Sequence, residues 1–210
     1  CGFKNCKPLI PLNGKTFIEW SIDSVNFSNI NKQFIFIILE ENKDELIKNL
    51  KKNIHDCIIY TIPKLTRGAT ETCLAAIESI DNDIPLIITN SDQIFEWDKE
   101  KYINYLFDNK IEANVVTVKE NTDKFSYIQI NEDGYGIKLA EKEIISEYAL
   151  AGIHYWNKGS MFIESAKELI KRDIRSKNEY YISLTYNILI EKGVKVSQYL
   201  LDNNENYLSI

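Results

Sequence analysis

Continuous apolar runs of strand length alternate with helical segments through the first 118 residues, and this alternation constrains the fold most. The apolar runs cover residues 34–39, 57–61, 86–89 and 113–118. Unbroken apolar strands are typical of parallel sheets buried on both faces. The segments with helical spacing cover residues 16–25, 43–52, 69–80 and 99–108. The pattern predicts an α/β fold with a mostly parallel sheet flanked by helices.

The pattern changes after residue 119. Residues 125–130 alternate between polar and apolar, Asp133-Gly134 is a turn signal, and residues 137–140 complete a predicted β-hairpin. Further strands are predicted at residues 148–156 and 194–200, and further helices at residues 159–171 and 181–191. We expect one domain over residues 1–210. Its half at 1–118 is of a nucleotide-binding type, and its half at 119–210 covers a second substrate.

The charge balance narrows the class of partner. The 210 residues carry 25 Lys and Arg against 31 Asp and Glu, a formal net charge of −6. Such a chain lacks a broad positive surface for nucleic acid or an anionic membrane. No apolar stretch approaches the roughly 20 residues that span a bilayer. We expect a cytoplasmic protein that binds small molecules, with no nucleic acid and no membrane as partners.

The cysteines and histidines do not form a metal-binding pattern. The cysteines are Cys1, Cys6, Cys57 and Cys73. No Cys-x-x-Cys pair is present, and the two histidines are isolated, whereas zinc ligands usually come at close spacing. We therefore expect reduced thiols and no zinc site.

Two segments of the first half carry residues suited to anion binding. In Cys6-Lys7-Pro8-Leu9, the proline biases Lys7 towards extended backbone, so that it projects towards an anion. The alternative is a solvated lysine in a loop. In residues 66–72 (TRGATET), small residues at a helix start leave backbone N–H groups open to a nucleotide. The alternative is that Thr66 or Thr70 caps the helix.

Two further segments add carboxylates. The run at 86–89 ends in Asn90-Ser91-Asp92-Gln93, where ligands of open α/β sheets bind, and Mg²⁺ prefers one or two carboxylates together with phosphate oxygens. The alternative is a turn that closes the strand. Glu141-Lys142 ends a hairpin strand, where the pair either contacts a phosphorylated acceptor or forms a surface ion pair.

In this order and spacing, the four segments resemble the nucleotidyltransferases that activate sugar phosphates and related phosphorylated small molecules. The likeness is to the branch associated with bacterial capsular polysaccharides, and it covers nearly the whole chain. It implies a Rossmann-like, mostly parallel mixed sheet flanked by helices, the GT-A-like nucleotidyltransferase fold. A β-hairpin subregion is implied on the acceptor side.

The resemblance also implies roles for individual residues. The catalytic residues are Lys7 and Asp92, of which Asp92 binds Mg²⁺. The nucleotide-binding residues are Thr66, Arg67, Gly68, Ala69 and Ser91. The acceptor-binding residues are Ser126, Glu141, Lys142, Gly152 and Glu179. The acceptor's phosphate attacks the α-phosphorus of a nucleoside triphosphate, with CTP favoured, and pyrophosphate leaves. The acceptor is a sugar phosphate, phosphocholine or a phospho-amide, and a homodimer is a further expectation.

The chain departs from the family pattern at three places. A glycine-rich loop normally precedes the Lys-Pro motif, but only six residues precede Lys7, and the whole chain has 8 glycines. We interpret the chain as truncated before this loop. Ser209 stands where many relatives have a metal-binding aspartate, which leaves Asp202 or Glu205 as candidates for a second metal ligand. Ser126 stands where some relatives have glycine, which suggests a different acceptor.

Two other classes of function are consistent with the same segments. A glycosyltransferase of this architecture also places an acid at a strand end, but usually as Asp-x-Asp, and Ser91-Asp92-Gln93 lacks that motif. A non-catalytic nucleotide-binding regulatory domain would bind nucleotide without turnover.

Overall fold

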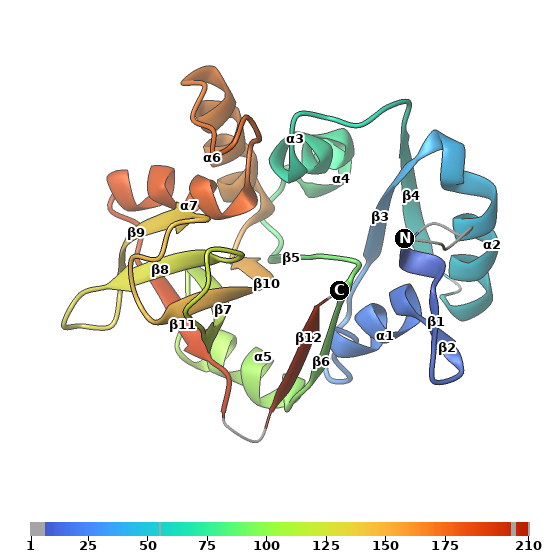
Figure 1. Cartoon of the computed structure of the whole chain (residues 1–210), viewed down its shortest axis with the longest axis horizontal. Coiled ribbons are helices and arrows are strands. Elements are labelled where there is room, and N and C mark those ends of the chain that lie inside the picture. Colours follow the sequence, from blue (N-terminus) through green and yellow to red (C-terminus); the bar gives the residue numbers. More distant parts are fainter. Residues whose placement is uncertain (1–6, 55, 203–204, 210) are drawn as a thin grey trace. The chain divides into compact units, whose positions relative to one another are not determined.

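The computed structural model describes residues 7–54, 56–202 and 205–209, and these group into two compact units (Figure 1). Unit 1 takes its residues from Cys1–Leu65, Asn90–Asn104 and Asn203–Ile210, and unit 2 from Thr66–Thr89 and Tyr105–Asp202. Cys1, Cys6 and His55 lie outside the described residues. The division into halves at residue 118 stays a prediction about substrate binding, which a grouping by contacts does not test.

The described residues of unit 1 form three separate pairs of strands. Its elements are η1 (Lys7–Leu9), β1 (Pro11–Leu12), β2 (Lys15–Thr16), α1 (Phe17–Ser24), β3 (Phe34–Leu39), η2 (Glu40–Asn42), α2 (Lys43–Asn53), β4 (Cys57–Ile62), β6 (Gln93–Glu96), the start of α5 (Lys99–Asp108) and β12 (Asn206–Ser209). Strands β3 and β4 pair in parallel, whereas β1 pairs with β2, and β6 with β12, in antiparallel orientation. Helix α1 contacts both η1 and β6.

The start of α1 follows from local chemistry. The Glu19 carboxylate accepts hydrogen bonds from the Thr16 backbone N–H and the Thr16 hydroxyl, both at 2.6 Å. A glutamate three residues after a threonine in this way satisfies backbone donors that a helix start leaves open. Two isoleucines one turn apart on the inner face of α1 then join Leu50 of α2 in a buried cluster. The apolar spacing therefore decides which face of α1 is buried.

Unit 2 is built on one six-stranded mixed sheet. Its elements are α3 (Ala69–Cys73), η3 (Leu74–Ala76), α4 (Ile77–Ile80), β5 (Leu86–Thr89), the end of α5, β7 (Ala113–Lys119), β8 (Ser126–Ile130), β9 (Gly136–Glu141), β10 (Tyr148–Trp156), α6 (Gly159–Lys171), α7 (Ile182–Glu191) and β11 (Val196–Leu200). The strand order is β11-β7-β10-β8-β9, and β5 also pairs with β10. Strands β5, β7, β8 and β11 share one direction, and β9 and β10 run opposite to it.

Large aromatic side chains fill the core of unit 2. The Trp156 ring stacks on Tyr186 with centroids 4.9 Å apart and packs at a tilt against Phe162, also at 4.9 Å. These residues come from β10, α7 and α6 in turn. Helix α7 also contacts β9 and β11 (Figure 1). Burial of this aromatic surface fixes α6 and α7 on the sheet.

The fold agrees with most of the sequence-based predictions. The predicted strands at 86–89 and 148–156 and helices at 99–108 and 159–171 have the observed bounds, and the hairpin at 125–140 is present as β8 and β9. The continuous helix predicted at 69–80 is wrong, because a 3₁₀ turn, η3, separates α3 from α4. Apolar spacing does not detect this break, since i+3 and i+4 neighbours lie on the same helix face. Strands β1, β2, β6 and β12 and the 3₁₀ helices η1 and η2 were not predicted. The extended backbone expected for Lys7 is wrong, because Lys7 is the first residue of η1.

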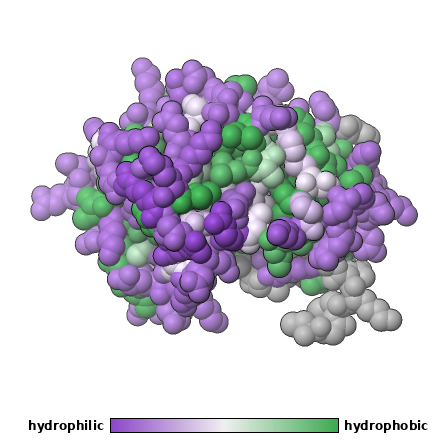
Figure 2. All heavy atoms as spheres, turned by 90° about the horizontal axis from the view of Figure 1, so that it is seen from above, coloured by the Kyte–Doolittle hydropathy of each residue, from purple (hydrophilic) through white to green (hydrophobic). Residues whose placement is uncertain are grey.

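The surface seen in Figure 2 is largely hydrophilic, with hydrophobic side chains exposed in places. The exposed large hydrophobic residues among those described are Ile58, Leu65, Ile84, Phe107, Ile137, Ile144, Leu200 and Leu208. In the described part of the chain, no helix combines the length and the apolar character that crossing a bilayer requires.

Candidate active site

Lys7 and Asp92 are in direct contact within unit 1. The Lys7 ammonium, on η1, donates a hydrogen bond to Asp92 Oδ2 at 2.6 Å. Asp92 lies in the turn before β6, next to the exposed Ser91. The two side chains are 48% and 29% exposed, so both remain open to solvent and to a ligand. The first and third sequence segments, 85 residues apart, therefore meet.

The turn that carries Asp92 is fixed at both ends. On one side, the Asn90 carbonyl accepts a hydrogen bond of 2.8 Å from the Ser21 hydroxyl of α1. On the other side, β6 pairs with β12, with Gln93 opposite Ser209. Ser209 is thus the direct strand partner of the residue after Asp92.

The donor set at Asp92 fits a cation that is completed by phosphate oxygens. Among residues 7–54, 56–202 and 205–209, no three His, Cys, Asp or Glu side chains cluster around a possible metal position. The Glu205 carboxylate instead accepts a hydrogen bond of 2.9 Å from the Asp98 backbone N–H. A single accessible carboxylate suits Mg²⁺, which usually binds through one or two carboxylates plus substrate phosphates and water. Asp92, already in contact with a lysine ammonium, is the residue that would hold it.

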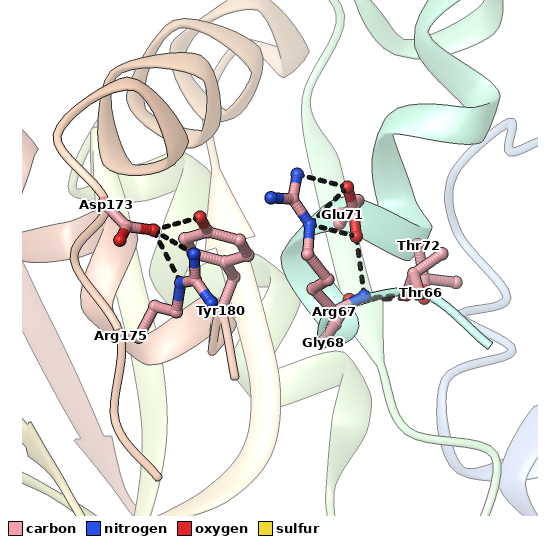
Figure 3. A network of polar contacts seen from close by, with 8 residues as sticks. All are labelled: Thr66, Arg67, Gly68, Glu71, Thr72, Asp173, Arg175 and Tyr180. Atoms are coloured by element: carbon pink, nitrogen blue, oxygen red, sulfur yellow. Dashed lines mark hydrogen bonds and ion pairs between the residues drawn. The ribbon is translucent and has the colours of Figure 1, made fainter. Parts of the chain in front are cut away.

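The second segment forms a tightly hydrogen-bonded turn in unit 2 (Figure 3). The Thr66 hydroxyl donates to the Gly68 carbonyl at 2.9 Å and lies 2.6 Å from the Thr72 hydroxyl. The N-cap of α3 is Gly68, and no side chain caps the helix, so the capping role considered for Thr66 or Thr70 is wrong. Ala69 is the first residue of α3.

Arg67 is bound to Glu71 as a fork. Its Nη2 lies 2.7 Å from Glu71 Oε1, its Nε 3.1 Å from the same oxygen, and its backbone N–H donates to Oε2 at 2.6 Å. Hydrogen bonds from the guanidinium lower the pKa of Glu71, and the carboxylate in turn raises the pKa of Arg67. The pair fixes the direction of the turn relative to α3.

Gly68 permits the close approach of the turn to Tyr180. Its φ is +134°, and an added Cβ would lie 2.5 Å from the Tyr180 backbone nitrogen. The Tyr180 N–H donates to the Arg67 carbonyl at 2.8 Å, and the Thr70 N–H donates to the Tyr180 carbonyl at 3.0 Å. Only glycine suits this backbone conformation and this spacing.

Tyr180 also organises a cluster of charges that the sequence did not reveal. Its hydroxyl donates to Asp173 at 2.5 Å, and Arg175 Nε donates to the same carboxylate oxygen at 2.6 Å. The guanidinium carbons of Arg67 and Arg175 lie 5.1 and 4.8 Å from the Tyr180 ring centroid. In Figure 3, Arg67 extends from the turn before α3, and Arg175 extends from the loop after α6. The hydrogen bond from Tyr180 lowers the pKa of Asp173.

Three of the predicted acceptor residues form one group in unit 2. Ser126 and Glu141 are cross-strand partners in β8 and β9, and the Ser126 hydroxyl donates to Glu141 Oε2. The Lys142 ammonium lies 3.8 Å from Glu141 Oε1 and donates to the Lys124 carbonyl at 2.5 Å. The Glu141 side chain is only 4% exposed. The idea that Glu141 and Lys142 form an ordinary surface ion pair is therefore wrong for Glu141.

Two predicted acceptor residues have different settings. Gly152 lies in β10 with φ +85°, within the stretch where the register of β10 against β7 shifts. Such a positive φ favours glycine, and the bulge redirects the strand. Glu179 pairs with Ser176 through two backbone hydrogen bonds of 2.9 and 3.1 Å. Burial and the nearby Glu179 and Glu141 carboxylates raise the pKa of Tyr181.

Comparison with known proteins agrees with this architecture. A model of the nucleotidyl transferase family matches residues 3–203, and the chain belongs to that family. The chain is 25% identical over 217 residues to the bifunctional protein GlmU of Acetivibrio thermocellus, a match that covers 99% of this chain and 45% of that protein. The chain thus spans less than half the length of this curated relative.

Solved structures show the same fold. A nucleoside-diphosphate-sugar pyrophosphorylase from Vibrio cholerae RC9 superposes with a TM-score of 0.83 at 20% identity, over 99% of this chain and 88% of that one. A Bacillus anthracis protein assigned as a glucose-1-phosphate thymidylyltransferase gives 0.75 at 18% identity, over 98% and 81%. The predicted α/β fold with a mixed sheet flanked by helices is confirmed.

Proposed function

We propose that the chain transfers a nucleoside monophosphate from a nucleoside triphosphate to a phosphorylated small molecule and releases pyrophosphate. The contact between Lys7 and Asp92 is the observation that carries this proposal. It brings together, at one place on unit 1, the Lys7 ammonium, which is suited to neutralising phosphate charge, and the Asp92 carboxylate, which is suited to binding Mg²⁺. Family membership supports the reaction class.

Each residue group has a role in this reaction. Lys7 stabilises the negative charge that develops on the reacting phosphates. Asp92 would hold Mg²⁺, which would supply further charge neutralisation for the triphosphate. The turn of Gly68 and Ala69 binds the nucleobase through backbone groups. An acceptor phosphate is already a nucleophile, so the residues need to position the reactants rather than remove a proton.

CTP is the donor that the resemblance to capsule-type cytidylyltransferases favours, and synthesis of a surface polysaccharide is the corresponding role. The Bacillus anthracis relative is assigned to thymidylyl transfer, which makes dTTP the first competitor. On the acceptor side, Lys142 takes the phosphate and Glu141 takes hydroxyl or amine donors. Glucose 1-phosphate and phosphocholine represent the two acceptor classes.

An assay of pyrophosphate release tests the reaction. CTP, UTP, GTP and dTTP are each incubated with Mg²⁺ and either glucose 1-phosphate or phosphocholine. We expect release with one donor and one acceptor class, and only when both are present. Nucleotide binding without release would favour a regulatory domain, and turnover of a nucleotide-sugar donor would favour a glycosyltransferase. Either result would contradict the proposal.

A further inference from the structure

Serine side chains from three elements of unit 2 converge on Glu141. The hydroxyls of Ser126 in β8 and Ser183 in α7 both donate to Oε2, the latter at 3.0 Å. The hydroxyl of Ser176, in the loop before α7, donates to the Glu141 backbone carbonyl at 3.2 Å. A glutamate at the end of a hairpin strand is thus tied to the neighbouring strand, to a helix and to a loop.

The Glu141 carboxylate is buried, and its burial requires compensating partners. A carboxylate removed from water is costly unless hydrogen bonds or a counter-charge compensate for the lost hydration. Two hydroxyl donors on Oε2 and the Lys142 ammonium 3.8 Å from Oε1 provide that compensation. An apolar residue would fill the same space without needing these partners. The chain instead keeps a carboxylate with one oxygen held by serines and the other on the side of Lys142.

The backbone around Glu141 is fixed as well. The Lys142 N–H donates to the Phe125 carbonyl at 3.0 Å, which extends the β8–β9 ladder past Glu141. Lys142 itself has φ +58°, a left-handed conformation that is uncommon for a residue with a side chain. Its ammonium is anchored on the Lys124 carbonyl. The strand therefore turns immediately after Glu141, while the Glu141 carboxylate is held in place.

The charges near Glu141 indicate which ligand group it receives. Glu141 and Glu179 both act on Tyr181, the residue that precedes α7, and help to raise the pKa of its phenol. The Glu141 carboxylate acts as a hydrogen-bond acceptor, and both observed donors are on Oε2. Its other oxygen therefore suits a hydroxyl or an ammonium group of the acceptor, and the neighbouring Lys142 ammonium, 3.8 Å from Oε1, binds the acceptor's phosphate.

We infer that Ser126 and Ser183 are positioning residues that hold the Glu141 carboxylate ready to accept a hydrogen bond from a hydroxyl or ammonium group of the acceptor. This inference rests on the proposed function. It gives Ser126 a different role from the direct acceptor contact expected from the sequence, and it adds Ser183, which the sequence did not single out.

The test uses the variants Ser126→Ala and Ser183→Ala of the full chain, with pyrophosphate release measured for glucose 1-phosphate and phosphocholine. We expect each variant to raise the KM for the acceptor by roughly 3- to 10-fold, since a hydrogen bond to a charged group is lost. The KM for the nucleotide is expected to stay unchanged. Ser126→Thr and Ser183→Thr keep the hydroxyl and should restore the acceptor KM. Ser165→Ala is the matched control, because Ser165 is a buried serine of α6 that donates to the Phe162 carbonyl.

The outcomes separate this inference from the proposed function. Wild-type turnover with an unchanged acceptor KM in both alanine variants overturns the inference and leaves the proposed function standing. An equal rise in the KM for nucleotide and acceptor, or the same effect in Ser165→Ala, also overturns it, because either result indicates general destabilisation. Absence of pyrophosphate release by the wild-type chain with every donor and acceptor overturns the proposed function, and the inference with it.

Discussion

At the residue scale, the ion pair of Lys7 and Asp92 is better suited to function than to stability. Both side chains are partly exposed, and an exposed pair of this kind stabilises a fold by about 1 kcal/mol at most. The cost of exchanging the lysine for a metal ion and phosphates at Asp92 is correspondingly small. Asp92 can therefore be changed with little effect on folding, which makes it a clean probe of activity.

Replacement of Asp92 by asparagine should abolish most turnover. The neutral amide is a weaker metal ligand, so we expect a loss greater than the roughly 10- to 100-fold that is typical when only a residue supporting a metal site is changed. Pyrophosphate release and the urea midpoint measure activity and stability separately. The control Asp56→Asn alters an exposed aspartate of the same unit and should change neither. Near wild-type turnover of Asp92→Asn would exclude Asp92 as the metal ligand.

Among the predicted acceptor-binding residues, only some of the observed contacts could be predicted from the sequence. The pairing of Glu141 with Ser126 follows from the predicted hairpin, because residues near its two open ends lie opposite each other. Ser183 contacts the same carboxylate from a helix 42 residues further along the chain. No local pattern marks it, since Ser183 is one of three polar residues, with Thr185 and Asn187, in the first two turns of this helix.

At the scale of elements, the turn before α3 depends on glycine. Gly68 combines a φ of +134° with an approach to Tyr180 that leaves no room for a side chain. Two backbone hydrogen bonds tie the turn to Tyr180, and the Arg67–Glu71 fork ties it to α3. Any residue larger than glycine has to displace the backbone of Tyr180.

The variant Gly68→Ala should therefore lower the free energy of unfolding by at least about 2 kcal/mol, through backbone strain and the contact with Tyr180. Urea denaturation of the wild-type protein and of Gly68→Ala measures the difference in the free energy of unfolding. The matched control is Gly134→Ala in the β8–β9 turn, where φ is +82° but no atom lies within 4 Å of the added Cβ. That control isolates the strain of a positive φ, about 1 kcal/mol. Equal losses in both variants would mean that the approach to Tyr180 is not close in solution.

At the scale of the whole molecule, the aromatic core of unit 2 contains a histidine that cannot be protonated at low cost. His154 in β10 stacks against both Trp156 and Tyr186, with ring centroids 6.2 and 5.8 Å away, and its Nδ1 is buried without a hydrogen-bond partner. Burial lowers the pKa of His154 from 6.5 to about 3. Protonation of this ring therefore requires opening of the core.

This burial predicts a loss of stability in mild acid. Well above pH 6.5 the imidazole is neutral in both states and contributes nothing to the pH dependence. Between pH 6.5 and about 3 the unfolded chain binds a proton that the folded chain does not. The free energy of unfolding therefore decreases as the pH is lowered through this range. From pH 7 to pH 5 the free energy of unfolding should drop by about 2 kcal/mol from this group. Urea midpoints of the wild-type chain and His154→Phe check it, because the variant should lose this part of the slope. Parallel slopes would contradict the prediction.

The amino-acid sequence by itself determined the helices and strands of the two units, apart from the break at Leu74–Ala76, the 3₁₀ helices η1 and η2, and the short strands β1, β2, β6 and β12. These elements follow from apolar spacing, turn residues and caps such as Thr16 with Glu19, all of which act over a few residues. The tertiary structure alone decided that β10 runs antiparallel to three neighbours, that Lys7 meets Asp92, and that Ser183 reaches Glu141. Such contacts depend on which distant strands become neighbours, and that choice minimises the free energy of the whole core rather than of any one segment.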